Sequence, residues 1–256
     1  EPLSNESTAL NIEEAIRLNK NASSHMSLRG LIYMDLGENA LAEKDFDAAI
    51  KLAPSYGQFY ADRATVRRRQ NKTKEALEDA DRAIKLGYNG ANGYNARGLV
   101  RTQAKDFKGA LEDFETALTK APKNATIQAN LGRCYYNMGQ NERALQEYAK
   151  ALALDPKSST ALRYRSELYE AKGELDKARA DALDAVLSEP TSPTTRALAK
   201  RLVPSAIDII DQETLTSSAA TSFGQPAVMT GILISKDWKE PANDPSVNVL
   251  WKPRTP

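Results

Sequence analysis

The sequence predicts an all-α solenoid in which pairs of helices repeat along the chain. Small residues recur every 34 residues over five successive units, without any insertion. Each unit contains two stretches whose apolar residues have the spacing of an amphipathic helix. A glycine or a proline stands at most of the places where these helices should end. The 256 residues are 27% charged and 41% hydrophobic, which is typical of a folded protein.

Three columns of small residues define the period. The first column contains Gly30, Ala64, Gly98, Gly132 and Ser166; the second contains Ala42, Ala76, Ala110, Ala144 and Ala178; the third contains Ala49, Ala83, Ala117, Ala151 and Ala185. A fourth column contains Pro54, Tyr88, Pro122, Pro156 and Pro190. Helices approach closely only where side chains are small, so the first three columns predict contacts between helices. The fourth column predicts the end of the second helix of each unit.

This period divides the whole chain into segments. We expect a partial N-terminal helix in 1–22, followed by five full units at 23–56, 57–90, 91–124, 125–158 and 159–192. After the units we expect a capping helix or helices in 193–213. Residues 214–256 are expected to form an extended tail, with a short hairpin as an option. In the fourth unit the helices are expected over 125–138 and 141–154, with Gly139 at the turn between them. The other units have Gly37, Asn71, Lys105 and Gly173 at that position. Lysine rarely adopts left-handed geometry, so Lys105 predicts a differently built third turn.

The tail after the repeats differs in composition. Its five prolines argue against a long helix, and short strands are expected near 227–235 and 246–252. Trp238 and Trp251 are costly to leave in water. We therefore expect the tail to fold back on the solenoid, or to associate with a second copy of the chain. The alternative is that it belongs to a domain or partner outside this sequence.

Two further columns predict ion pairs within the units. Arg29, Arg63, Arg97, Leu131 and Arg165 precede the first small column, and Asp45, Asp79, Asp113, Glu147 and Asp181 follow sixteen residues later. The unit that lacks the arginine also has a different acid, so we expect four salt bridges between helices rather than a site for an acidic ligand.

The small, aromatic and proline positions over 34 residues resemble the signature of the tetratricopeptide repeat family. This resemblance implies a right-handed α-solenoid whose concave face, lined by the first helix of each unit, usually holds a peptide or an extended segment of a partner. By this resemblance the partner-binding residues are Leu31, Arg68, Arg69, Asn92, Asn95, Leu99, Asn130, Arg133, Tyr136, Asn137, Arg163 and Tyr164, with Gln58 and Asp62 on the same face. Asparagine can bond a peptide backbone, and tyrosine and arginine commonly anchor interfaces.

The function expected is a non-catalytic scaffold for protein–protein interaction. Two alternatives stay open: an interaction module of a larger enzyme or assembly, and a groove that is regulated by its own C-terminal tail. An inner face that binds nothing strongly is the plainer interpretation. In the tetratricopeptide domains that hold chaperone tails, lysine and asparagine stand at the fifth and ninth places of one unit, and no unit here has that pair. Only Asn130 matches that clamp.

Several chemistries are not expected. The chain has one cysteine, Cys134, and one histidine, His25, so a metal cluster built on those residue types is excluded, and no cofactor or catalytic residue is expected. No apolar run approaches the ~18 residues of a membrane span. The net charge of +1 argues against binding of nucleic acid. The non-Met start, the single cysteine and the missing clamp favour a bacterial protein, either exported to the periplasm or cell envelope or cytoplasmic.

One dense basic cluster stands out, comprising Arg63 and residues 67–69, with Lys72 and Lys74 close behind. An anion or phosphate site is one interpretation of it. A solvated helix end is the other, and we favour it because cationic side chains stabilise helix C-termini.

Overall fold

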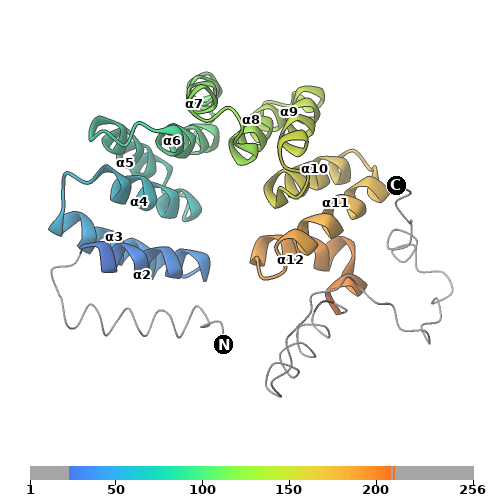
Figure 1. Cartoon of the computed structure of the whole chain (residues 1–256), viewed down its shortest axis with the longest axis horizontal. Helices are drawn as coiled ribbons and strands as arrows, with labels where there is room; N and C mark the ends of the chain where they lie inside the picture. The colour runs from blue at the N-terminus through green and yellow to red at the C-terminus, as the bar shows by residue number, and fades with distance from the viewer. Residues whose placement is uncertain (1–22, 209, 211–256) are drawn as a thin grey trace, which may run out of the picture. The chain divides into compact units, whose positions relative to one another are not determined.

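A computed structural model describes residues 23–208 and 210, and these residues are all-α (Figure 1). The helices are α2 Ser23–Asp35, α3 Asn39–Leu52, α4 Gly57–Arg69, α5 Thr73–Lys85, α6 Ala91–Gln103, α7 Phe107–Lys120, α8 Ala125–Asn137, α9 Asn141–Leu154, α10 Ser159–Ala171, α11 Leu175–Ser188 and α12 Pro193–Leu202. Residues 204–208 and 210 are also helical. No strand occurs within the described ranges. The predicted helical solenoid class is therefore confirmed.

Two predicted segments lie outside the described residues. They are the partial helix in 1–22 and the tail in 214–256, including its expected strands and both tryptophans. The internal contacts divide the chain into two compact units, with the boundary between Ala144 and Leu145. Helices α2 to α8 belong to the first unit and α10 to α12 to the second, while α9 crosses the boundary.

Helices in the first unit pack as consecutive pairs. Helix α2 packs on α3, α4 on α5, and α6 on α7, and the second helix of each pair also contacts the first helix of the next. In addition, α2 contacts α4, α4 contacts α6, and α6 contacts α8. The first helices therefore form a continuous row, which is the arrangement that lines one face of a repeat protein.

The second unit ends in the expected capping helix. Helix α12 packs against α11 and α10. Leu198 and Ala199 of α12 join Leu183 and Val186 of α11 in one buried cluster. The helical residues that follow α12 extend this cluster, because Ile207 is buried in it as well. An open end of a helical stack exposes an apolar face, and this cap covers it.

The small columns lie where helices meet, as the sequence predicts. All ten alanines of the second and third columns are at most 1% exposed. A Cβ atom at Gly30 would lie 3.1 Å from the Phe46 ring, and one at Gly98 would lie 2.9 Å from the Phe114 ring. Both phenylalanines are fully buried. Glycine in the first helix thus makes room for an aromatic ring from the second.

The turn inside each unit has the same backbone, including the third. The residues Gly37, Asn71, Lys105, Gly139 and Gly173 have φ values of 82, 62, 61, 75 and 77°. The amide of Asp106 donates to the Arg101 carbonyl at 2.9 Å, and the amide of Lys72 donates to the Arg67 carbonyl at 2.9 Å. The expectation that Lys105 changes the turn is wrong, because the backbone bonds hold it in the left-handed conformation despite its side chain.

Candidate partner-binding face

All four predicted salt bridges are present, and each arginine holds its carboxylate with two nitrogens. The Nη2–Oδ1 distances are 2.6 Å for Arg29–Asp45, 2.6 Å for Arg63–Asp79, 2.7 Å for Arg97–Asp113 and 2.7 Å for Arg165–Asp181. In every pair the arginine Nε donates to the same carboxylate. The four aspartates are 2–5% exposed. Two parallel hydrogen bonds make this the strongest kind of arginine–carboxylate contact, and it joins the two helices of a repeat.

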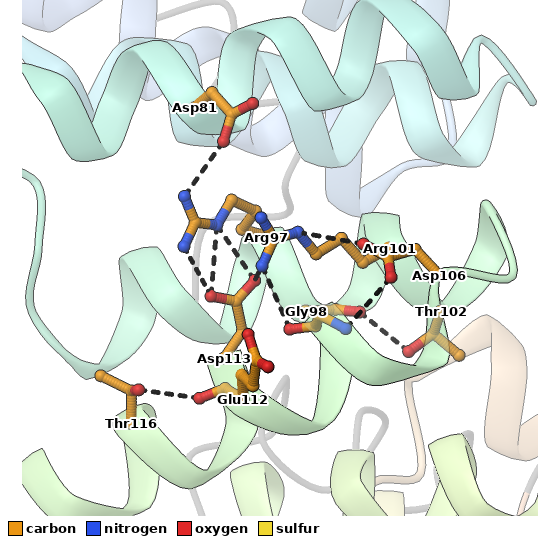
Figure 2. Close-up of polar contacts among 10 residues, drawn as sticks. Asp81, Arg97, Gly98, Arg101, Thr102, Asp106, Glu112, Asp113 and Thr116 are labelled. Carbon is orange, nitrogen blue, oxygen red and sulfur yellow. Dashed lines mark hydrogen bonds and ion pairs between the residues drawn. The ribbon is translucent and has the colours of Figure 1, made fainter.

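Two of these arginines also connect neighbouring repeats. The Nη1 atom of Arg97 donates to Asp81 at 3.0 Å, while its other nitrogens hold Asp113, as Figure 2 shows. Arg63 makes the same pair of contacts, to Asp47 at 2.6 Å and to Asp79. Asp113 raises the pKa of the Arg97 guanidinium, so the arginine stays charged at any ordinary pH. The positive charges of the ladder arginines are therefore neutralised by aspartates of the fold itself.

In the second and third units, a second arginine also donates a hydrogen bond to the aspartate of the ladder. Arg67 donates to Asp79 at 2.8 Å, and Arg101 donates to Asp113 at 2.9 Å. Figure 2 shows both Arg97 and Arg101 on Asp113. In the first and fifth units a tyrosine stands at the Arg101 position, and the ladder arginine lies over its ring, 5.8 Å from the centroid in both Arg29–Tyr33 and Arg165–Tyr169.

The basic cluster of α4 is therefore largely structural. Arg63 and Arg67 are bound to carboxylates, and Arg67 also donates to Glu43 at 2.9 Å. Burial acts to raise the pKa of Glu43, but hydrogen bonds from Lys72 and Arg67 hold it below its ordinary value. Residues 67–69 form the last turn of α4, which agrees with the helix-end interpretation.

In the unit without the ladder arginine, the acid has a different partner. Glu147 is 8% exposed and accepts a hydrogen bond at 2.8 Å from Lys150 on its own helix. This contact lies within one helix, unlike the ladder bridges between helices. This local pairing follows from the i,i+3 spacing.

The predicted binding residues lie on the first helices of the repeats. Leu31 is on α2; Arg68 and Arg69 are on α4; Asn92, Asn95 and Leu99 are on α6; Asn130, Arg133, Tyr136 and Asn137 are on α8; Arg163 and Tyr164 are on α10. We call the surface of α2, α4, α6 and α8 that carries these residues the first-helix face. Because these four helices contact one another in turn, the structure brings ten of the twelve residues onto one row. The other two belong to the second unit.

Some of these residues contribute to the fold as well. Asn130 is 4% exposed, and its Nδ2 donates to Oδ1 of Asn95 at 2.9 Å, which links α8 to α6. Leu31 and Leu99 pack against buried clusters of the core. Arg69 donates to the carbonyl of Met34 at 2.6 Å. Asn92 and Asn137 are exposed to solvent.

Arginine and tyrosine form stacked pairs at two of the predicted positions. The guanidinium of Arg133 lies 5.1 Å from the centre of the Tyr136 ring in α8. In α10 of the second unit, Arg163 lies 4.3 Å from the centre of the Tyr164 ring and donates to Glu167 at 3.1 Å. Stacking orders both long side chains in advance, which lowers the entropy that a partner must overcome on binding.

The first-helix face also carries a polar cluster that the repeat pattern of the sequence does not predict. Tyr56 and Tyr88 lie in the connections before α4 and α6, beside Gln58, Asp62 and Asn92. Tyr88 was visible in the sequence only as the exception in the proline column. The hydroxyl of Tyr56 donates to Oε1 of Gln58 at 3.4 Å. The Gln58 side chain acts to lower the pKa of Asp62, against the larger effect of burial, which raises it.

The side chains that could carry covalent or metal chemistry have ordinary surroundings. Cys134 is fully buried in the cluster around Phe114 and Ile127, and burial raises the pKa of its thiol. Within residues 23–208 and 210, no group of three or more His, Cys, Asp or Glu residues is placed to hold a metal ion. None of the helices in that part of the chain has the length and apolar character needed to cross a membrane.

Comparison with known proteins identifies the repeats. Three family models described as tetratricopeptide repeat match residues 26–56, 101–149 and 129–194. No curated protein sequence matches the chain.

Several solved structures, two of them described as tetratricopeptide repeat proteins, share the fold. One from Parabacteroides merdae ATCC 43184 is 15% identical with a TM-score of 0.68, and the match covers 77% of this chain and 77% of that one. A thermophilic protein of this family in Thermus thermophilus is 21% identical with a TM-score of 0.64, covering 71% and 100%. A chain of the APC/C hetero-tetramer Cut9-Hcn1 is 16% identical with a TM-score of 0.61, covering 78% of this chain and 40% of that one. At these identities the likeness shows the shared fold alone.

Proposed function

Because this chain is a tetratricopeptide repeat protein, we propose that it is a non-catalytic scaffold that binds a peptide, or an extended segment of a partner protein, along its first-helix face. The observation that carries the proposal is the row of contacts from α2 through α4 and α6 to α8. An extended peptide needs a continuous surface several helices long, and this row supplies one. The Cut9-Hcn1 hetero-tetramer is a protein assembly in which the same fold occurs.

The residue types on that face suit this role. The ion-pair ladder between the helices holds its arginines on carboxylates of the fold, so the ladder offers no open anion site to compete with a partner. Asn92 and Asn137 are exposed, and an asparagine side chain carries both a donor and an acceptor for a peptide backbone. The Arg133–Tyr136 stack adds an anchor of the kind that dominates interface energetics.

Site-specific crosslinking tests this proposal. A photo-crosslinking amino acid replaces Asn137 on α8 in the full chain, and a matched variant carries it at Glu112, which is exposed on α7. With lysate of the native host, we expect a defined partner protein to crosslink from Asn137 and not from Glu112. An Arg133→Ala/Tyr136→Ala variant should reduce that crosslink at least fivefold. Equal crosslinking from both positions, or none from Asn137, contradicts the proposal.

The two alternatives are separated by truncation and by the partner's identity. Removal of residues 223–256 should increase the crosslink from Asn137 if the tail competes for the face. An unchanged yield removes tail regulation. A partner that is an enzyme subunit would support a role as the interaction module of a larger assembly, with the binding face itself unchanged.

A further inference from the structure

Asp62 differs from the buried aspartates of the first unit. It lies in α4 on the first-helix face, one turn after Gln58. Its Oδ2 atom is buried and has no hydrogen-bond partner among the described residues. The ladder aspartates Asp45, Asp79 and Asp113 are each held by arginine, whereas no ion pair reaches Asp62 from the described part of the chain. Carboxylates with little exposure are normally paired and fully hydrogen-bonded in folded proteins, so Asp62 is unusual on this face.

Glycines in the fold make room for the side chain of Tyr88, which lies near Asp62. Tyr88 replaces the proline that ends the second helix in the other units. A Cβ atom at Gly93 would overlap the carbonyl of Tyr88, and one at Gly57 would lie 2.9 Å from the Cβ of Tyr88. Gly87, just before it, has a φ of 87°. Glycines on both first helices and in the connection therefore allow Tyr88 to sit between α4 and α6.

Other polar side chains lie near the Asp62 carboxylate. The charges of Asp62 and Tyr56 and the side chain of Asn92 act on the Tyr88 phenol. The Gln58 side chain acts on the carboxyl group of Asp62 and accepts a hydrogen bond from Tyr56. Tyr56 is 51% exposed and Asp62 is partly exposed, so the cluster lies at the surface. A carboxylate beside two phenols and two amide groups can accept several hydrogen bonds and favours positive charge.

We propose that Asp62, together with Tyr56, Gln58, Tyr88 and Asn92, binds the ammonium or guanidinium group of a lysine or arginine side chain in the partner peptide. The proposal rests on the function proposed above and adds the chemistry of the partner at this place. A cation that reaches the exposed part of the Asp62 side chain neutralises a carboxylate that no ion pair from the described residues reaches. The tyrosine rings bind the aliphatic stem and attract the charged end.

The electrostatics of the cluster agree with this assignment. Burial raises the pKa of Asp62 to about 6, against the smaller opposing effect of the Gln58 hydrogen bond. Burial, and then the charge of Asp62, raise the pKa of Tyr88, so its phenol stays neutral beside Asp62. A bound cation stabilises the ionised carboxylate, so binding should lower the pKa of Asp62 and weaken as the pH falls below about 6.

A titration with small probes tests the site in the full chain. The probes are Nα-acetyl-lysine amide and Nα-acetyl-arginine amide, and Nα-acetyl-norleucine amide is the neutral control of the same length. We expect the two cations to lower the pKa of Asp62, read from its carboxyl carbon by NMR, and to shift the Tyr88 ring signals. Norleucine amide should do neither. If norleucine amide acts as strongly as the cations, or if the cations leave both signals unchanged, the proposal is wrong.

Variants separate this site from general binding. Asp62→Asn should weaken lysine amide at least fivefold, and Tyr88→Phe should weaken it less, while Glu78→Gln, exposed on α5, should leave it unchanged. Equal affinity in Asp62→Asn and the wild type overturns the site. This outcome is independent of the crosslink from Asn137, so a failed cation site and a failed peptide-binding face give different results.

Discussion

Arg97 and Asp113 are the central pair of the ion-pair ladder, and they are joined across two helices by three hydrogen bonds of 2.7–3.2 Å. The Asp113 side chain is 3% exposed and that of Arg97 is 17% exposed, so water does little to screen this pair. The exposed Arg–Asp pairs of most proteins contribute much less than a pair in such surroundings.

Removal of Arg97 should therefore be costly. We expect Arg97→Ala to lower the free energy of unfolding by about 3 kcal/mol, because a buried carboxylate then loses its main partner. In Asp113→Ala the loss should be similar, and the double variant should lose less than the sum of the two. Urea titration of all four proteins measures the coupling. Strict additivity would show that the pair contributes nothing beyond its separate parts.

A second prediction concerns the contact between Gly109 and Arg101. The Nη1 atom of Arg101 donates to the Gly109 carbonyl at 3.1 Å, and a Cβ at Gly109 would lie 3.1 Å from both Cδ and Nη1 of Arg101. It would also meet the Asp106 carboxylate that caps α7. We expect Gly109→Ala to destabilise the wild type by about 1–2 kcal/mol.

The same substitution should be better tolerated when Arg101 is shortened. In an Arg101→Ala background the closest contact, with the Asp106 carboxylate, remains, so Gly109→Ala should cost only somewhat less. Thermal unfolding of the four variants gives both values. An equal cost in the two backgrounds would mean that Arg101 is not what requires glycine at this position.

The third prediction uses the turn at Lys105. Its φ of 61° lies in the left-handed region, which costs a residue with a side chain about 1 kcal/mol. Lys105→Gly removes this strain and adds some backbone entropy to the unfolded chain, so we expect a net gain of about 0.5 kcal/mol. Gly173→Ala, at the same turn position with a φ of 77°, is the matched control and should lose about 1 kcal/mol. A loss of stability in Lys105→Gly would contradict the assignment of strain.

The fourth prediction concerns pH. The pKa of Asp62 is raised from 3.8 to about 6, because burial disfavours the charged form. The folded state therefore holds this proton more tightly than the unfolded state, and stability contributed by Asp62 rises as the pH falls from about 7 to 4. At pH 8 the charged carboxylate opposes folding.

Asp62→Asn removes that charge while it keeps the shape of the side chain. We expect the variant to be more stable than the wild type by about 1–3 kcal/mol at pH 8, and the difference to shrink at pH 4. Urea unfolding at the two pH values measures both. A difference that is the same at pH 8 and pH 4 would show that the asparagine acts through packing or hydrogen bonding rather than charge.

Much of the fold could be predicted from residues at fixed spacing. Gly98 lies against Phe114 and Arg97 lies beside Asp113, and the two residues of each pair are sixteen residues apart. Contacts of these two kinds recur along the 34-residue repeats with the same geometry. Candidate site residues were harder to evaluate. The sequence places Asn95 and Asn130 on one face, but whether they bond each other or a partner depends on the distance between α6 and α8.

The sequence alone thus determined the helix pairs, the small residues between them and the four arginine–aspartate bridges, since these follow from local periodicity and pairwise chemistry. The tertiary structure decided how each departure from the repeat is used. Backbone hydrogen bonds hold Lys105 in a glycine-like turn, Arg101 joins Arg97 on one carboxylate, and Tyr88 lies near Asp62, which no ion pair from the described residues reaches. These outcomes depend on the three-dimensional neighbours of each residue, which the repeat pattern alone does not specify.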